Sequence, residues 1–179
     1  MTSMWWTVRS MVCAGVLLLV GCTGVPEGIT PVKDFELPRY MGTWHEIARL
    51  DHSFERGMSQ VTADYALNKD GSVKVTNRGY LDDKGKWKEA IGKAKFVGDK
   101  DVGHLKVSFF GPFYGGYVIY ELDHEHYQYA FVTSYNRKYL WLLARSPIIG
   151  DALRERFVSQ AGELGFDTEA LIWVDHVIH

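Results

Sequence analysis

The sequence contains few cysteines. Only Cys13 and Cys22 occur among its 179 residues. Cys13 lies in an apolar N-terminal stretch, so the chain beyond residue 22 offers no thiol for a disulfide or a nucleophilic site. The sequence also lacks a GxSxG nucleophile motif and a glycine-rich loop placed between a strand and a helix. We therefore expect a protein that is not an enzyme and that holds no cofactor.

The sequence also lacks a large excess of either positive or negative charge. The chain has 20 Lys and Arg residues against 22 Asp and Glu residues, which gives a formal net charge of -2. Because a nucleic-acid-binding surface requires a basic excess, we expect no nucleic-acid partner. His124 and His126 lie in a predicted turn without an obvious third ligand, so we expect no metal site.

Long hydrophobic runs are missing except near the N-terminus. Residues 11–20 form an apolar run that is too short for a spanning helix, which needs about 20 such residues. With Arg9 before it, the run is typical of a signal peptide. Residues 19–22 read LVGC and resemble the lipobox of bacterial lipoproteins. That resemblance implies a lipoprotein signal peptide over residues 1–21 and acylation of Cys22. The alternative is an ordinary signal peptide with an incidental cysteine.

The residues after Cys22 bear on location. Thr23 follows the cysteine, where an inner-membrane retention signal usually has Asp, and this resembles outer-membrane lipoproteins. We expect an extracytoplasmic protein anchored by acyl chains to the cell outer membrane, on either of its faces. Each buried CH₂ contributes about 0.8 kcal/mol, so more than one chain gives stable attachment. Residues 22–38 contain three prolines and are expected to form the lipidated N-terminus and a tether, with the folded domain over residues 39–179.

Short apolar segments separated by turn residues dominate the rest of the chain. Eight strands at this spacing predict an antiparallel sandwich or an up-and-down barrel. Residues 151–164 place their apolar side chains on one helical face, with Asp151 as the expected N-cap and Gly165 just beyond the end. Residues 170–174 predict a short final strand. The eight expected strands are 43–50, 60–67, 72–80, 87–97, 103–110, 114–122, 127–134 and 138–145.

This order of elements resembles the lipocalin family, and three motifs carry the resemblance. It implies an all-β fold: an eight-stranded antiparallel up-and-down lipocalin barrel with one C-terminal α-helix and a short final strand. It also implies that the last motif's arginine packs over the tryptophan ring at the closed end, a cation–π contact worth about 0.5–2 kcal/mol. One departure is Leu122, where the family usually has Thr. The motif residues are Gly42 and Trp44, then Asp123 and Tyr127, then Arg145.

Two longer stretches, 42–57 and 107–117, resemble the bacterial lipocalins, a subgroup of outer-membrane lipoproteins. His45 departs from the Tyr usual there. The likeness, over residues 28–175, implies a membrane-anchored lipocalin that carries or stores fatty acids or lysophospholipids for cell-envelope lipid maintenance. It also allows a homodimer. The alternatives are a carrier of another hydrophobe, such as haem, a retinoid or a sterol, and a structural lipoprotein with a filled barrel.

Candidate ligand-binding residues follow from strand alternation, since every second side chain shares a face. Trp44 sets the inward face of the first strand and Arg145 that of the eighth. A third set comes from residues 109–117, where aromatics and glycines interleave. Turn packing and an aromatic rim for a lipid or a partner chain both fit that run. An inward Glu46 either pairs with another charge or contacts the ligand; pairing is favoured, because burial without a partner is costly. The candidates are Glu46, Ala48, Leu50, Phe109, Tyr117, Tyr139 and Trp141.

Overall fold

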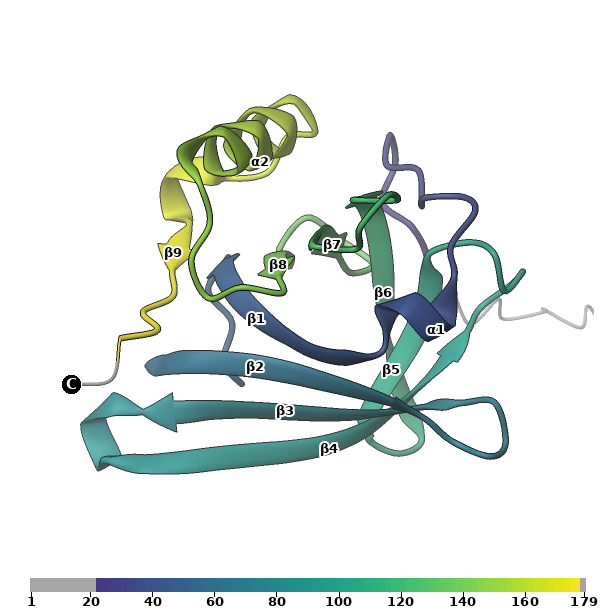
Figure 1. Cartoon of the computed structure of the whole chain (residues 1–179), viewed down its shortest axis with the longest axis horizontal. Helices are drawn as coiled ribbons and strands as arrows, with labels where there is room; N and C mark the ends of the chain where they lie inside the picture. The colour runs from purple at the N-terminus through teal and green to yellow at the C-terminus, as the bar shows by residue number, and fades with distance from the viewer. Residues whose placement is uncertain (1–21, 178–179) are drawn as a thin grey trace, which may run out of the picture.

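The chain forms a closed β-barrel with one helix packed outside it (Figure 1). The computed structural model describes residues 22–177, so the expected signal peptide lies outside the described residues. Two 3-10 turns cover Asp82–Lys84 and Thr168–Ala170. The helices and strands, in chain order, are α1 (Leu37–Tyr40), β1 (Gly42–Arg49), β2 (Met58–Leu67), β3 (Val73–Leu81), β4 (Lys86–Phe96), β5 (His104–Phe110), β6 (Phe113–Leu122), β7 (Tyr129–Thr133), β8 (Leu140–Ala144), α2 (Asp151–Glu163) and β9 (Ile172–Trp173).

The first strand closes the barrel. Strands β2 to β8 follow one another as antiparallel neighbours, and β1 pairs with both β8 and β2. β9 adds to β1 outside the ring, with Ala48 opposite Trp173. The predicted eight-stranded antiparallel barrel, with one helix and a short final strand, is confirmed. In this up-and-down order, the loops after β1, β3, β5 and β7 surround one end of the barrel, which we call the mouth.

Helix α2 lies against the outer face of the barrel. Phe157 and Ala161 on the helix are fully buried in a cluster that includes Leu142 of β8. The prediction that Asp151 caps this helix is wrong, because Gly150 occupies the cap position and makes no side-chain cap bond. Gly165 follows the end of the helix with φ 79°, a left-handed conformation that glycine adopts without strain.

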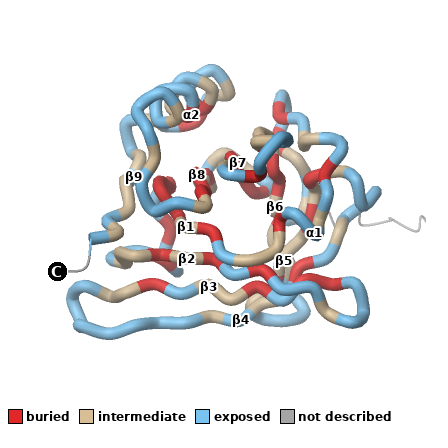
Figure 2. The backbone as a smooth tube through the Cα atoms, viewed as in Figure 1, coloured by how far each residue is buried: buried red, intermediate tan, exposed pale blue. Residues whose placement is uncertain are grey.

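Burial differs sharply between strands because only some have two covered faces. Figure 2 shows β7 and β8 largely buried, whereas β4 is exposed along most of its length. The strands nearest α2 have the helix outside and the barrel interior inside. Their apolar residues therefore form two separate clusters, one inside the barrel and one beneath the helix.

A β-bulge in β1 changes which of its side chains face inward. The pairing with β8 runs from Glu46 opposite Leu143 to Ala48 opposite Leu142, so one extra residue of β1 lies between these pairs. After the bulge the alternation is reversed. Arg49, not Leu50, then shares the inner face with Glu46.

Residues 22–38, expected to form a tether, lie instead along the barrel. The backbone N–H of Val32 donates to the carbonyl of Ile119 at 2.9 Å, and Ile29 and Phe35 are buried. The Arg137 guanidinium binds the carbonyls of Glu27 and, at 2.6 Å, Leu164. The tether assignment is therefore corrected: apolar side chains in this segment give it surface to bury.

Candidate ligand-binding cavity

The barrel interior contains a cavity of about 470 Å³ that is open at the mouth. Its walls are mainly apolar side chains from strands β2 to β8. A volume of this size falls within the range of ligand pockets, about 300–1,000 Å³. Representative wall residues are Val61, Val75, Ala94, Leu105, Val132 and Leu143.

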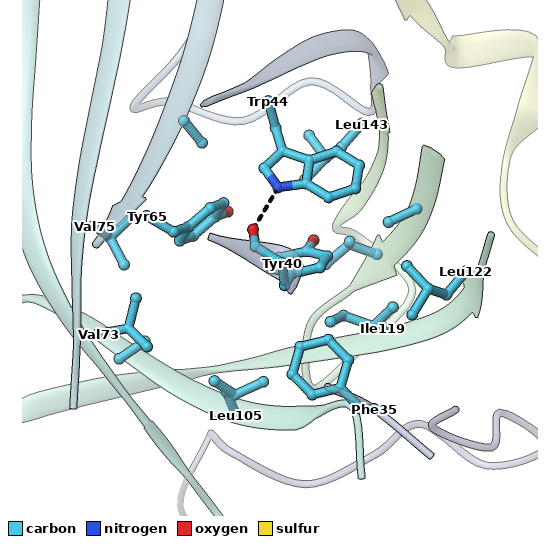
Figure 3. Packing of buried hydrophobic residues seen from close by; sticks show 14 of the residues in the cluster. Phe35, Tyr40, Trp44, Tyr65, Val73, Val75, Leu105, Ile119, Leu122 and Leu143 are labelled. Carbon is cyan, nitrogen blue, oxygen red and sulfur yellow. Dashed lines mark hydrogen bonds between the residues drawn. The ribbon is translucent and has the colours of Figure 1, made fainter. Parts of the chain in front are cut away.

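The closed end is filled by Trp44 and by the turn of α1 that precedes it. The Trp44 ring is fully buried, and its Nε1 donates to the carbonyl of Tyr40 at 2.8 Å (Figure 3). The Tyr40 ring lies 4.6 Å from the Trp44 ring, centroid to centroid. Pro38 lies in the first turn of α1, where its missing N–H costs nothing, and this turn comes directly before β1.

Arg145 covers the other side of the Trp44 ring. Its guanidinium carbon lies 4.0 Å from the ring centroid. The guanidinium nitrogens donate to backbone carbonyls of Thr43, Arg39 and Met41, each at 2.9 Å, and of Tyr127 at 3.3 Å. Burial lowers the pKa of Arg145 from its ordinary value. Arg145 thus ties residues 39–43 and the loop before β7 to the end of β8 through neutral acceptors.

The second motif organises the loop at the same end. The Asp123 carboxylate accepts from the backbone N–H groups of His126 and Gln128, each at 3.2 Å. Tyr127 adopts φ 54°, and its hydroxyl accepts from the backbone N–H of Glu36 at 2.9 Å. Asp123 and Tyr127 therefore support the closed end and do not line the cavity.

Three tyrosine hydroxyls meet inside the otherwise apolar barrel. The hydroxyl of Tyr117 lies 2.8 Å from that of Tyr40 and 2.9 Å from that of Tyr65. Burial raises the pKa of Tyr117, and also that of each of its two neighbours. All three hydroxyls remain neutral and satisfy one another, which limits the cost of burying them.

Below the mouth, β8 and the residue just before it turn two aromatic side chains into the cavity. Trp141 and Tyr139 both line it, with ring centroids 5.9 Å apart. Leu142, the residue after Trp141, faces the opposite way and is fully buried in the cluster beneath α2. The register inferred from Arg145 is therefore present in the structure.

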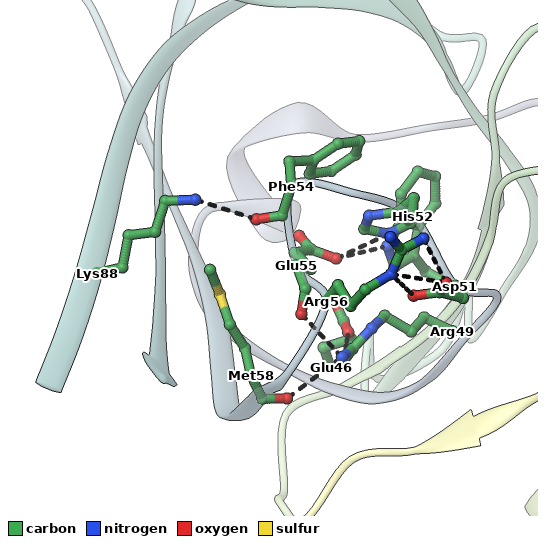
Figure 4. A network of polar contacts seen from close by, with 10 residues as sticks. Glu46, Arg49, Asp51, His52, Phe54, Glu55, Arg56, Met58 and Lys88 are labelled. Carbon is green, nitrogen blue, oxygen red and sulfur yellow. Dashed lines mark hydrogen bonds and ion pairs between the residues drawn. The ribbon is translucent and has the colours of Figure 1, made fainter. Parts of the chain in front are cut away.

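Glu46, Arg49, His52 and Glu55 form a buried polar cluster (Figure 4). Arg49 donates to Glu46 at 2.8 Å and to the carbonyl of Glu55 at 2.9 Å. His52 Nε2 lies 2.9 Å from Glu55 Oε2, and Trp141 Nε1 donates to that oxygen at 3.3 Å. The cluster joins β1, the loop after it and β8.

The two carboxyl groups of this cluster differ in acidity. Burial and the negative charge of Glu55 hold the pKa of Glu46 well above its usual range, and Arg49 only partly opposes this. Burial also raises the pKa of Glu55, but its contacts with His52, together with hydrogen bonds to Glu46 and Trp141, more than compensate, so that pKa lies below its ordinary value. The pair therefore favours a neutral Glu46 beside an ionised Glu55.

Five of the seven candidate ligand-binding residues line the cavity: Glu46, Phe109, Tyr117, Tyr139 and Trp141. Ala48 and Leu50 do not, because the bulge turns them outward into the cluster beneath α2. Their assignment to the cavity is wrong. Alternation missed Arg49 for the same reason, and it missed His52 and Glu55 because they belong to a loop. A charged residue, Arg49, three positions after Glu46 was the available signal.

Two further observations concern the described residues only. None of the helices within residues 22–177 has the length and apolar character needed to cross a bilayer. Within the same range, no three His, Cys, Asp or Glu side chains gather in a way that would hold a metal ion.

Comparisons with known proteins identify the family. Residues 35–176 match the family model described as a lipocalin-like domain. The chain is 58% identical over 158 residues to the outer membrane lipoprotein Blc of Vibrio cholerae, covering 88% of this chain and 92% of that protein. It is 48% identical over 159 residues to outer membrane lipoprotein Blc of Escherichia coli K12, covering 88% and 89%. The chain therefore belongs to the lipocalin family.

The fold itself is shared more widely. Insecticyanin of the tobacco hornworm Manduca sexta superposes with a TM-score of 0.67 at 21% identity, covering 85% of this chain and 86% of that one. At this identity the likeness concerns the barrel alone. Together with the cavity, these comparisons define a barrel of the hydrophobe-binding carrier class.

Proposed function

We propose that this protein binds and carries or stores fatty acids or lysophospholipids for cell-envelope lipid maintenance. The observation that carries the proposal is the apolar cavity of about 470 Å³, open at the mouth and lined there by Tyr139 and Trp141. A filled barrel is disfavoured by that cavity. A long apolar chain can occupy the interior while a polar head group stays at the wet, aromatic mouth.

The energetics suit reversible carriage. An acyl chain of about 16 carbons gains about 12 kcal/mol when it leaves water, at about 0.8 kcal/mol per CH₂. Association costs at least about 4 kcal/mol. The balance of about -8 kcal/mol corresponds to micromolar binding.

The attachment to the membrane is part of the same proposal. Cys22 is exposed in the structure, and two relatives that match most of the chain are named outer membrane lipoproteins. We place the protein at the cell outer membrane, held by acyl chains on Cys22. More than one long acyl chain is needed for a stable anchor.

Trp141→Ala tests whether the ligand occupies the barrel. The substitution removes a large wall side chain, so displacement of a fluorescent fatty acid should show affinity weakened at least about tenfold, or about 1.4 kcal/mol. The matched control is Leu142→Ala, which faces the helix and should instead destabilise the fold by about 2–5 kcal/mol. Unchanged affinity in Trp141→Ala would place the ligand elsewhere. Identifying lipids extracted from the purified domain, by mass spectrometry, would separate acyl lipids from haem, retinoids or sterols.

Cys22→Ala tests the anchor. The barrel should fold unchanged, because Cys22 contributes no buried side chain, while the protein moves from the membrane to the soluble fraction. Cell fractionation followed by an alkaline wash provides the measurement. A variant that stays firmly attached would exclude acylation of Cys22 as the means of attachment.

A further inference from the structure

The N-terminal segment begins beside the mouth of the barrel. The carbonyl of Cys22 accepts a hydrogen bond from the backbone N–H of Gly116 at 2.7 Å. The Gly116 carbonyl in turn accepts from the hydroxyl of Ser134, at 2.7 Å, in the loop after β7. Since that loop belongs to the mouth, Gly116 and Cys22 lie at the mouth as well. Cys22 is also one of the residues that line the cavity there.

From Cys22 the chain leads away from the mouth. The carbonyl of Thr23 lies 2.8 Å from Nε2 of His104. His104 pairs with Val118, which is two residues farther along β6 towards the closed end than Gly116. Cys22 therefore lies nearer the mouth than Thr23, the residue that follows it.

Large aromatic side chains project from the rim next to Cys22. Phe110 and Phe113, at the tip of the hairpin between β5 and β6, are 82% and 79% exposed. Phe54, in the loop after β1, is 46% exposed, and all three border the same cavity as Cys22. Phe113 precedes Gly116 by three residues, which is about 10 Å along a strand. The anchor position and the aromatic rim thus occupy one end of the molecule.

We propose that this rim is a membrane-docking surface: Phe54, Phe110 and Phe113 contact the bilayer that holds the acyl chains of Cys22, and the mouth opens onto the lipid. The inference rests on the proposed acylation. Aromatic side chains favour the interfacial layer of a bilayer, and clustered exposed apolar groups of this size mark interaction sites. An acyl ligand then passes between the leaflet and the cavity without crossing bulk water.

The test uses the full acylated protein in vesicles of phosphatidylethanolamine and phosphatidylglycerol that contain a nitroxide-labelled phosphatidylcholine. Single cysteines are introduced by Gly111→Cys at the mouth and Gly98→Cys at the opposite end, then labelled with bimane. A Cβ at either glycine meets no atom within 4 Å, and neither has a positive φ. The Gly111 label should lose about half its fluorescence, as expected at the interface, while the Gly98 label loses little.

The double variant Phe110→Ser, Phe113→Ser removes two aromatic side chains of the rim, and Ile148→Ser is its matched control. Ile148 is 81% exposed but lies after β8, away from the mouth. The double serine variant should abolish most of the quenching at Gly111→Cys, and Ile148→Ser should not.

Three outcomes would overturn the proposal. Vesicle flotation with equal or no quenching at both labels rejects this orientation but leaves the anchor intact. A dimer that dissociates in the double serine variant, with the mouth label unquenched, assigns the rim to a second copy of the chain. Absence of both flotation and an acyl group on Cys22 in mass spectra rejects the anchor itself, and the docking proposal with it; fatty-acid displacement then still tests the cavity.

Discussion

Two arginines at opposite ends of this barrel, Arg145 and Arg49, have different surroundings. Arg145 at the closed end is held by four backbone carbonyls and the face of Trp44. Arg49, near the mouth, is fully buried; it pairs with the Glu46 carboxyl and donates to the backbone carbonyls of Glu55 and Met58. The closed end therefore uses neutral acceptors that do not titrate near neutral pH. The mouth end uses ionisable groups that contact a cavity residue, so there stability and binding are coupled.

Arg49→Met should show the largest effect. It removes the donor to Glu46 and to the carbonyls of Glu55 and Met58 in a buried site. Without Arg49 these buried acceptors lose their donor and the ionised Glu55 loses a neighbouring positive charge, so we expect a loss of about 3–5 kcal/mol. Denaturant unfolding of the domain without its acyl chains measures the loss. The affinity for a fatty acid, measured by displacement, should also weaken, because Glu55 accepts a hydrogen bond from the cavity residue Trp141. A loss below about 1 kcal/mol would mean that the cluster is not a structural element.

Arg145→Ala should have a smaller effect on stability and little effect on binding. The substitution removes the guanidinium that covers Trp44 and binds four carbonyls, and we expect a loss of about 1–3 kcal/mol. Affinity for the fatty acid should change less than about threefold, since Arg145 does not line the cavity. If affinity fell as far as in Arg49→Met, the proposed separation between the two ends would be wrong.

Glu46→Gln should have the smallest effect, visible mainly as a change in pH dependence. The raised pKa of Glu46 means that the folded state keeps a proton that the unfolded state releases above its ordinary pKa of 4.5. The free energy of unfolding therefore falls as pH rises from 4.5 towards the raised pKa of Glu46 in the folded state. Glutamine cannot ionise, so the free energy of unfolding of the variant should fall less than that of the wild type as pH rises above about 4.5.

The comparison between the two ends supplies the control for that experiment. Arg145→Ala should show the wild-type pH dependence at lower stability throughout, because the hydrogen-bond acceptors of Arg145 are backbone carbonyls, which do not titrate. Parallel pH profiles for wild type and Glu46→Gln would show that Glu46 titrates as an ordinary exposed carboxyl.

Much of the fold could be predicted from the sequence, because turn residues and apolar periodicity are local signals. The register of β8 was also predictable: Arg145 and Trp141 are four residues apart on a strand without a bulge, so even spacing holds. The residues from 42 to 50 look equally regular, yet the bulge depends on how β1 pairs with β8, which is a long-range property. For that reason Ala48 and Leu50 were placed on the wrong face.

Two other features of the site depend on contacts between distant segments. His52 and Glu55 lie in a loop whose sequence is typical of solvent exposure, and only its fold over the mouth buries them. Residues 22–38 read as a proline-containing tether, but Ile29 and Phe35 find apolar surface that only the completed barrel provides. In both cases burial depends on a surface formed by distant segments, which cannot be read from the local sequence.

The packing of the N-terminal segment has a mechanical consequence. Cys22 is hydrogen-bonded to β6 through its own backbone, and Val32 is bonded to the same strand farther along. For a protein attached through Cys22, almost no flexible linker separates the point of attachment from the barrel. Rotation of the barrel about the attachment point would require those backbone hydrogen bonds to break. The orientation of the barrel is therefore fixed by the geometry of a few peptide groups.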